Sequence, residues 1–306
     1  MTTASSTAPI IYKSCPVCGS NHIAEVFRAK DYTVSQETFS IWHCEECQLR
    51  FTQNIPVEHE IGAYYQSEEY ISHSNTSKGL INGLYQTVRD YTLKQKRKLV
   101  EKISGTEKGN ILDIGCGTGE FLGTMKAAGW KTLGLEPDPG AREQVKTNQG
   151  VEVYDNEHLF SLADDSYDVI SMWHVLEHVH RLHDYLDKIQ SLLKPSGKFL
   201  VAVPNYQSVD ADHYQAYWAA YDVPRHLYHF SPSAMGRLMS RHGFKIVEYR
   251  KMPFDAFYVS LLSEKYKHGS MRLVPAFWTG LRSFLKNSAQ PKRGSSILYI
   301  IEKTKD

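Results

Sequence analysis

The chain has 306 residues, which is enough for one large domain and a smaller one. Its 35 basic residues nearly balance its 34 acidic ones, so a strong electrostatic attraction to nucleic acid is not indicated. No apolar stretch approaches the roughly twenty residues of a membrane-spanning helix. The beginning of the chain also lacks the basic and apolar regions of a signal peptide. We expect residues 1–10 to be a disordered tail and the protein to be cytoplasmic.

Four of the five cysteines form two C-x-x-C pairs, Cys15 with Cys18 and Cys44 with Cys47. Each pair can place two thiolates on one ion, and together they complete a closed tetrahedral site of the structural type that Zn²⁺ prefers. Disulfides are not expected in a reducing compartment. A redox-active pair would stand beside a βαβ unit, which this segment lacks. The spacing therefore predicts a zinc ribbon over residues 11–55.

Residues 56–105 form a connecting region with lid helices. Its first half is rich in tyrosine and small polar residues, including Tyr64, Tyr65 and Tyr70. These tyrosines either face a substrate or pack the ribbon against the rest of the chain. Beyond Lys78, apolar positions recur at helical spacing and predict one or two helices that lead into a core domain.

The run from Ile111 to Phe121 contains the pattern hydrophobic-hydrophobic-Asp-x-Gly-x-Gly-x-Gly. Its apolar residues predict a buried parallel strand, and its glycines let the backbone turn tightly against a ligand before a helix begins. The pattern resembles motif I of class I S-adenosylmethionine (SAM) methyltransferases. The resemblance implies that the turn lies against the methionine part of SAM and that the strand-end acid orients the SAM ammonium. The residues concerned are Asp113, Gly115, Cys116, Gly117 and Gly119.

Two later segments extend this resemblance. The strand at residues 131–135 ends in Glu136, where a carboxylate can accept hydrogen bonds from the two ribose hydroxyls of a cofactor. The segment Tyr167–Trp173 predicts a fourth strand, and we expect Trp173 to contact the cofactor. The His-Val-Leu-Glu-His-Val block that follows resembles the corresponding block in small-molecule methyltransferases.

The order of elements after this block also matches the family. An amphipathic helix is expected to close at residues 194–197, and a fifth strand follows at 199–203. The resemblance implies an α/β domain over residues 106–306 with a Rossmann-like sheet of seven strands, the last of them antiparallel. Insertions interrupt it at residues 205–231 and 253–293.

The insertion at 205–231 contains a His-x-x-x-Phe-Ser segment that begins at His226. Together with the four-cysteine ribbon and the histidine block after the fourth strand, it is similar to the sugar C-methyltransferases that act on nucleotide-linked deoxy-sugars. This similarity implies that His226 is the catalytic base and that His178 is a second active-site histidine. An imidazole titrates near neutral pH, which suits a base. Alternatively, either histidine only holds the backbone in place.

The chain departs from those enzymes at three points. Arg225 replaces the glutamate expected before the histidine, Val223 replaces a tyrosine, and the additional C-terminal domain is missing. Arg225 would either bind a carboxylate or phosphate of the acceptor or pair with Asp222 or Glu177. Transfer to oxygen and transfer to carbon therefore both stay open.

Residues 271–293 carry an apolar stripe flanked by basic residues. A basic amphipathic helix can lie on an anionic membrane surface. It can also form a wall of the acceptor pocket or a contact between two copies of the chain.

We favour a SAM-dependent methyltransferase that acts on a small molecule, such as a sugar, a nucleotide sugar or a natural-product precursor. One alternative is an RNA or protein methyltransferase that uses the ribbon for docking. A second is an O-methyltransferase of quinone precursors, which shares the Leu-Glu-His-Val sequence but not the ribbon. A third is a domain that binds SAM without turnover and serves as a scaffold.

Overall fold

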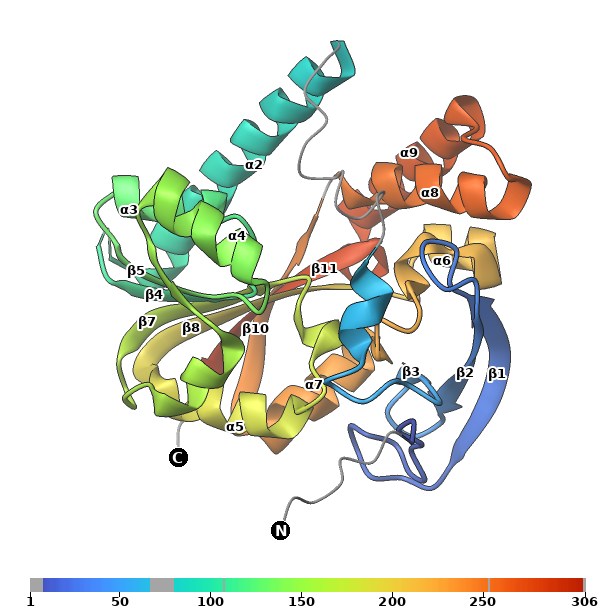
Figure 1. Ribbon diagram of the computed structural model, residues 1–306, viewed down its shortest axis with the longest axis horizontal. Helices are drawn as coiled ribbons and strands as arrows, with labels where there is room; N and C mark the ends of the chain where they lie inside the picture. The colour runs from blue at the N-terminus through green and yellow to red at the C-terminus, as the bar shows by residue number, and fades with distance from the viewer. Residues whose placement is uncertain (1–7, 67–79, 107, 253, 305–306) are drawn as a thin grey trace.

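The computed structural model describes residues 8–66, 80–106, 108–252 and 254–304, which form two sheets and the helices around them (Figure 1). The larger sheet has seven strands in the order β10-β11-β8-β7-β4-β5-β6. The strands are β4 (Asn110–Ile114), β5 (Lys131–Leu135), β6 (Glu152–Tyr154), β7 (Tyr167–Trp173), β8 (Leu193–Pro204), β10 (Phe244–Lys251) and β11 (Ser296–Lys303).

The topology confirms the Rossmann-like sheet with an antiparallel last strand. Strands β4 to β8 are mutually parallel, whereas β11 is antiparallel to both β8 and β10. The chain runs outward from β4 through β5 to β6 and then returns to β7 on the other side of β4. Ligands of such sheets bind beyond the carboxyl ends of the strands at this reversal.

Helices cover both faces of this sheet (Figure 1). Residues of α2 and α3 pack with one set of buried side chains of β4 and β7, and residues of α5 and α7 pack with the opposite set. Strand residues such as Ile111 and Leu112 point to opposite faces and are both fully buried, as expected for a parallel sheet covered on both sides. The helices are α2 (Leu80–Ser104), α3 (Glu120–Ala127), α4 (Pro139–Gln144), α5 (Leu182–Leu192) and α7 (Pro232–Arg241).

The helical spacing beyond Lys78 is confirmed by a single helix, α2. One other local expectation was wrong. Strand β8 begins at Leu193, not at residue 199, because the chain turns extended directly after α5 and Leu193 pairs with Tyr167.

The smaller sheet combines the N-terminal segment with a segment from the middle of the chain. Its order is β1 (Ile23–Lys30), β2 (Thr38–Cys44), β3 (Arg50–Thr52) and β9 (Tyr228–His229), and all its pairings are antiparallel. Strand β9 follows His226 directly. The N-terminal strands are therefore joined by backbone hydrogen bonds to the segment that carries the predicted base.

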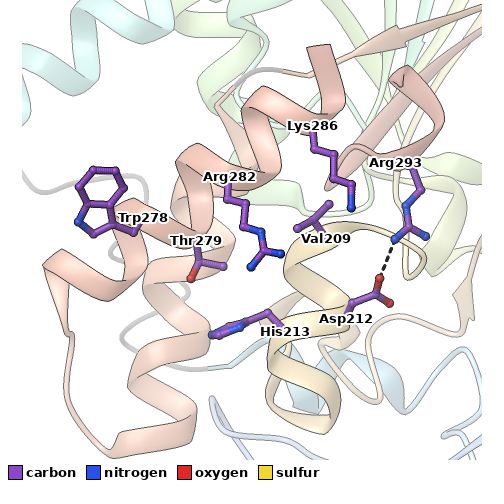
Figure 2. Close-up of a pocket in the computed structure, with 8 residues that line it drawn as sticks. All are labelled: Val209, Asp212, His213, Trp278, Thr279, Arg282, Lys286 and Arg293. Atoms are coloured by element: carbon purple, nitrogen blue, oxygen red, sulfur yellow. Dashed lines mark hydrogen bonds and ion pairs between the residues drawn. The ribbon is translucent and has the colours of Figure 1, made fainter. Parts of the chain in front are cut away.

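The remaining helices lie beside the smaller sheet and at the upper right of Figure 1. Helix α6 (Val209–Tyr214) follows β8, and the helical hairpin α8 (Asp255–His268) and α9 (Leu273–Ala289) precedes β11. A cavity of about 380 Å³ opens between α6 and α9 (Figure 2). Short helices are η1 (Ile61–Tyr65), η2 (Val145–Gln149), η3 (Asn156–Ser161), η4 (Leu176–His178), η5 (Gln215–Tyr217), η6 (Ala219–Tyr221) and η7 (Pro291–Arg293). Within the described ranges, no helix is long and apolar enough to cross a membrane.

Candidate functional site

The glycine turn lies at the carboxyl end of β4, where the strand order reverses. Gly115, Gly117 and Gly119 all have positive φ values, which side chains other than glycine rarely adopt. A Cβ at Gly115 would lie 2.4 Å from Cγ2 of Val175. A Cβ at Gly117 would meet no atom within 4 Å, so this residue faces open space. The turn is thus packed tightly on one side and open at its centre, as a cradle for a ligand would be.

Glu136 lies directly beside this turn. One carboxylate oxygen accepts a hydrogen bond from the amide of Gly117 at 2.9 Å, and the other accepts one from the amide of Asp138 at 3.0 Å. The side chain is largely buried, and burial raises its pKa. Each oxygen keeps a further lone pair, so the fixed carboxylate can accept hydrogen bonds from a ribose diol.

Asp113 is buried at the end of β4. Ser171 donates a hydrogen bond to it at 2.5 Å. Burial raises the pKa of Asp113 to about 7, although Ser171 and the ammonium of Lys96 both lower it. Ser171 and Lys96 do not fully offset the loss of hydration of the charged Asp113 carboxylate. An ammonium group of a ligand placed beside it would therefore be bound favourably.

Trp173 and Cys116 border the same region in different ways. The Nζ of Lys96 lies 3.8 Å from the centroid of the Trp173 indole, which also meets Phe121 edge to face. Burial raises the pKa of the Cys116 thiol, as do Asp113 and Glu136. Cys116 therefore stays protonated, in keeping with a space-filling role in the turn and not a nucleophilic one.

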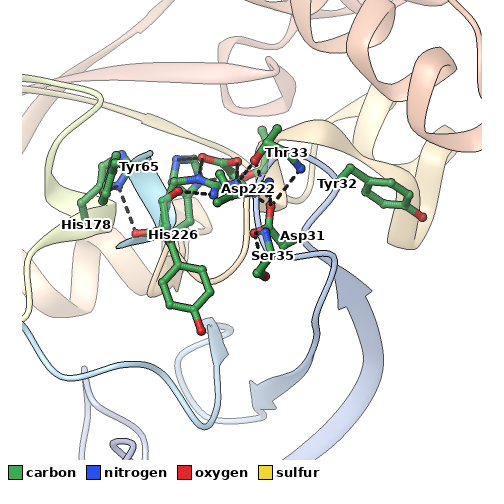
Figure 3. Close-up of polar contacts among 12 residues, drawn as sticks. Asp31, Tyr32, Thr33, Ser35, Tyr65, His178, Asp222 and His226 are labelled. Carbon is green, nitrogen blue, oxygen red and sulfur yellow. Dashed lines mark hydrogen bonds and ion pairs between the residues drawn. The ribbon is translucent and has the colours of Figure 1, made fainter. Parts of the chain in front are cut away.

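His178 and His226 come together from distant parts of the chain (Figure 3). Their ring centroids are 4.5 Å apart and their planes make an angle of 82°. Nδ1 of His226 donates to the carbonyl of Ala220 at 2.8 Å, and Nδ1 of His178 donates to the carbonyl of Arg225 at 3.0 Å. Since a carbonyl can only accept, both hydrogens are assigned to Nδ1, and each neutral ring keeps a lone pair on Nε2.

The two histidines have different electrostatic surroundings. Burial and the neighbouring His226 lower the pKa of His178 to about 4, so this ring is neutral at physiological pH. Nε2 of His226 lies 3.9 Å from Oδ2 of Asp222, which can stabilise an imidazolium. Tyr65 lies on the other side, with its hydroxyl 2.9 Å from Nδ1 of His178. One of the tyrosines of the connecting region therefore faces this site, while Tyr64 packs against Phe39 of the smaller sheet.

His174, which opens the histidine block after β7, is surrounded by carboxylates. His174 lies 3.2 Å from Asp255 and 3.5 Å from Glu177, and these carboxylates raise the pKa of His174 to about 10 against the effect of burial. Glu177 is fully buried. The His-Val-Leu-Glu-His-Val block therefore supplies a cationic His174, and Val175 of the same block packs against the glycine turn.

Arg225 is buried, and protein groups hold its guanidinium. Its guanidinium lies 3.0 Å from Asp31 and 2.6 Å from Asp222 and donates to the carbonyl of Tyr64 at 2.7 Å. Of the pairings considered from the sequence, the structure has the one with Asp222 and adds one with Asp31 of the N-terminal segment. The arginine thus ties the loop of His226 to the smaller sheet.

The four paired cysteines converge in the N-terminal segment. Their sulfur atoms lie within 4.8 Å of one another, and three of the four residues are buried. Gly19 and Gln48, which follow the two pairs, both have positive φ, and each donates its amide hydrogen to the carbonyl of the first cysteine of its pair. Tetrahedral Zn–S bonds of about 2.3 Å place sulfurs a little under 4 Å apart, so this set of donors fits Zn²⁺.

Strand β3 of the same segment holds the histidine loop. The hydroxyl of Thr52 donates to the carbonyl of His226 at 2.7 Å, and its amide donates to the carbonyl of Leu227 at 2.9 Å. The amide of Leu227 in turn donates to the carbonyl of Glu177 at 2.8 Å. The loop of His226 is therefore fixed between the cysteine-bearing segment and the end of β7.

Sequence reasoning missed Lys96, Asp31, Thr52 and Asp255. Lys96 lies on α2 near Asp113, and burial lowers its pKa to about 8. No local motif marks these residues, because each meets the site through a long-range contact. The helical spacing of α2 gave only a weak signal that one of its faces meets the strand ends.

A sequence profile described as a methyltransferase domain matches residues 85–249, just over half of the chain. GTPase Der of Leptospira interrogans is 31% identical over 116 residues, which are 38% of this chain and 23% of that protein. The mitochondrial ubiquinone biosynthesis O-methyltransferase of Schizosaccharomyces pombe is 29% identical over 100 residues, 30% of this chain and 36% of that protein. The matches thus span only about a quarter to a third of these curated relatives.

Among solved structures, the chain resembles 1,6-didemethyltoxoflavin-N1-methyltransferase of Burkholderia thailandensis, which was determined with 1,6-didemethyltoxoflavin and S-adenosylhomocysteine bound. The TM-score is 0.50 at 16% sequence identity, over 86% of this chain and 99% of that one. This likeness supports the fold. Residues 85–249 are a SAM-dependent methyltransferase domain of class I, and the chain belongs to the methyltransferase domain family.

Proposed function

We propose that the chain transfers the methyl group of SAM to an oxygen or carbon atom of a small-molecule acceptor, such as a sugar, a nucleotide sugar or a natural-product precursor. The observation that carries this proposal is the pairing of His178 with His226, whose ring centroids are 4.5 Å apart, because His178 belongs to the same block as Val175, which packs against the glycine turn. The relative from Schizosaccharomyces pombe, a ubiquinone biosynthesis O-methyltransferase, also acts in small-molecule metabolism by its name.

Asp113, Glu136 and the glycine turn would hold SAM. The buried Asp113 would pair with the SAM ammonium, and Glu136 would accept hydrogen bonds from the ribose hydroxyls. Gly115, Cys116, Gly117 and Gly119 would line the methionine part, with Trp173 beside them. When bound, SAM supplies a methyl group on a positively charged sulfonium, which is displaced in line by the acceptor. The chain contributes alignment of the two reactants.

His226 is the best candidate for the base. As the bond from the acceptor atom to the methyl carbon forms and the sulfur–carbon bond breaks, the proton lost by the acceptor would pass to Nε2 of His226. Asp222, 3.9 Å away, would stabilise the resulting imidazolium. The pKa of His178, about 4, makes it a poor base, and it would instead orient the acceptor through the lone pair of its Nε2.

We also propose that Cys15, Cys18, Cys44 and Cys47 bind one structural Zn²⁺. Four sulfur donors complete a tetrahedral site with no open position, so the ion would take no part in the chemistry. Its contribution would be to hold β3, and through Thr52 the loop of His226.

The test is an assay of S-adenosylhomocysteine formation by the full chain against panels of nucleotide sugars, quinol precursors and RNA. We expect turnover with a small molecule. We expect His226→Asn to lower kcat by about 10²–10⁴-fold with little change in SAM affinity. His158→Asn, at a half-buried histidine on η3, is the matched control.

Two results would contradict this proposal in different ways. Methyl transfer to RNA alone would exclude a small-molecule acceptor. Unchanged turnover by the His226→Asn enzyme would leave the methyltransferase activity intact but remove His226 as the base.

A further inference from the structure

Helix α9 buries its small residues and exposes its large apolar ones. Ala276, Gly280 and Ser283 face the protein: a Cβ at Gly280 would lie 2.8 Å from Cδ1 of Phe257 on α8, and Ser283 donates to Asp210 of α6 at 2.7 Å. The exposed fractions on the opposite side are 68% for Leu273 and 63% for Trp278. Surface helices ordinarily bury their large apolar residues, and a contiguous exposed set marks an interaction surface.

The exposed side of α9 consists of two adjacent rows at four-residue spacing. One row is apolar and the other passes from apolar to cationic along the helix. The rows are Leu273, Phe277, Leu281 and Leu285, and Val274, Trp278, Arg282 and Lys286, of which Leu281 is half-buried and the others are exposed. No aspartate or glutamate occurs in the helix. The solvent-facing side of α9 is therefore largely apolar, and all of its charged residues are cationic.

The cationic row lines the cavity between α6 and α9. Figure 2 shows Arg282 and Lys286 reaching from α9 toward α6, with Arg293 beside them and Trp278 at the outer end. Arg293 is neutralised by Asp212 at 2.7 Å. Arg282 and Lys286 form no ion pair with any side chain that the structure describes. The cavity thus offers two uncompensated cations to an anion that enters from the side of Trp278.

We propose that α9 docks on the surface of an anionic phospholipid membrane. The apolar row would enter the boundary between headgroups and acyl chains, where tryptophan and phenylalanine are favoured. Arg282 and Lys286 would pair with lipid phosphates. A second copy of this chain is a poorer occupant, because a dimer formed through this face would bury Arg282 and Lys286 against a helix that has no carboxylate to pair with them.

Sedimentation of the full chain with vesicles tests this proposal. We expect binding to phosphatidylcholine vesicles that contain phosphatidylglycerol, weak binding to phosphatidylcholine alone, and a loss of binding as salt is added. Addition of the anionic vesicles should shift tryptophan emission to the blue, and Trp278→Phe should remove most of that shift.

Paired variants separate charge from apolar insertion. Arg282→Gln/Lys286→Gln should weaken vesicle binding by about fivefold for each cation removed. Lys131→Gln/Lys146→Gln, which removes the same charge from exposed positions elsewhere, should have no such effect. Phe277→Ser/Trp278→Ser should abolish binding, whereas Val247→Ser, at an exposed apolar position on β10, should not.

Three results would overturn the proposal. The first is equal binding by the α9 variants and their controls. The second is a dimer in solution that Phe277→Ser/Trp278→Ser dissociates, which would make this face a contact between copies. The third is binding of inorganic diphosphate without any binding of vesicles, which would assign the cavity to a free phosphate compound. The affinity for SAM serves as an independent readout and should not change in any α9 variant.

Discussion

Arg225 and Asp31, from the middle of the chain and from its N-terminal segment, form a buried ion pair at 3.0 Å. Both side chains are almost completely shielded from solvent, and Asp31 also accepts hydrogen bonds from Thr33 and Ser35. Arg225 immediately precedes His226, so this pair sets the position of the predicted base relative to the smaller sheet. Arg225, at the position where the sugar C-methyltransferases were expected to have a glutamate, therefore has a structural role in this chain.

Arg225→Met should destabilise the protein strongly. Removing one partner leaves Asp31 and Asp222 buried without their cation, which costs about 3–5 kcal/mol. Denaturant unfolding followed by circular dichroism measures the free energy of unfolding. Arg181→Met is the control, because Arg181 pairs with Glu157 and Asp184 at the surface, where the loss should stay below about 1 kcal/mol. Equal losses of unfolding free energy in the two variants would show that the buried ion pair stabilises the fold no more than the surface pair does.

The local parts of the site could be predicted from the sequence. The glycine turn, Asp113 and Glu136 lie within single strand–turn segments whose residue types already dictate the backbone shape. The cysteines are equally local, since each C-x-x-C pair needs only one tight turn. The order of the strands could be inferred because the succession of strands and helices in the core of the domain resembles that of class I methyltransferases.

The long-range parts could not be predicted, because nothing in the sequence marks their partners. Strand β9 has only two residues, and its pairing with β3 depends on where the loop of His226 folds back. Arg225 had plausible partners within its own region, and Asp31 was not among them. Likewise, the apolar stripe of α9 predicts an amphipathic helix, yet small residues nearby let the helix pack with that stripe outward.

Binding of SAM should strengthen as the pH rises through 7. In the protein without SAM, the carboxyl group of Asp113 has a pKa of about 7. At pH 6 only about one molecule in ten therefore carries the charge that would pair with the SAM ammonium. Titration calorimetry should therefore find a Kd about fivefold higher at pH 6 than at pH 7.4, where the α-ammonium of SAM is still mostly protonated. Asp113→Asn should bind SAM weakly at all these pH values. A pH dependence that survives in Asp113→Asn would assign it to another group.

Glu136→Gln should weaken SAM binding while the overall fold is retained. The glutamine can accept a hydrogen bond from only one of the backbone amides of Gly117 and Asp138, so the turn is held less firmly. The amide keeps one acceptor oxygen but loses the charge that strengthens the hydrogen bonds to the ribose, a loss of about 1.5–3 kcal/mol, or roughly 10- to 150-fold in Kd. Glu143→Gln, at an exposed position on α4, is the matched control. If calorimetry gives both variants the wild-type Kd for SAM, Glu136 does not contact the ribose.

Thr52→Val should lower kcat while leaving SAM affinity intact. The substitution keeps the shape of the side chain but removes the hydrogen bond to the carbonyl of His226 and the contact of 3.1 Å with Nε2 of His229.

Cys47→Ser should lower kcat in the same way and also reduce the zinc content and the Tm, because it opens the proposed metal site next to β3. Steady-state kinetics, SAM calorimetry and metal analysis of both variants distinguish the two effects. If Thr52→Val retains full kcat, β3 does not position His226, even where Cys47→Ser destabilises the chain. In that case the cysteine-bearing segment would contribute stability alone.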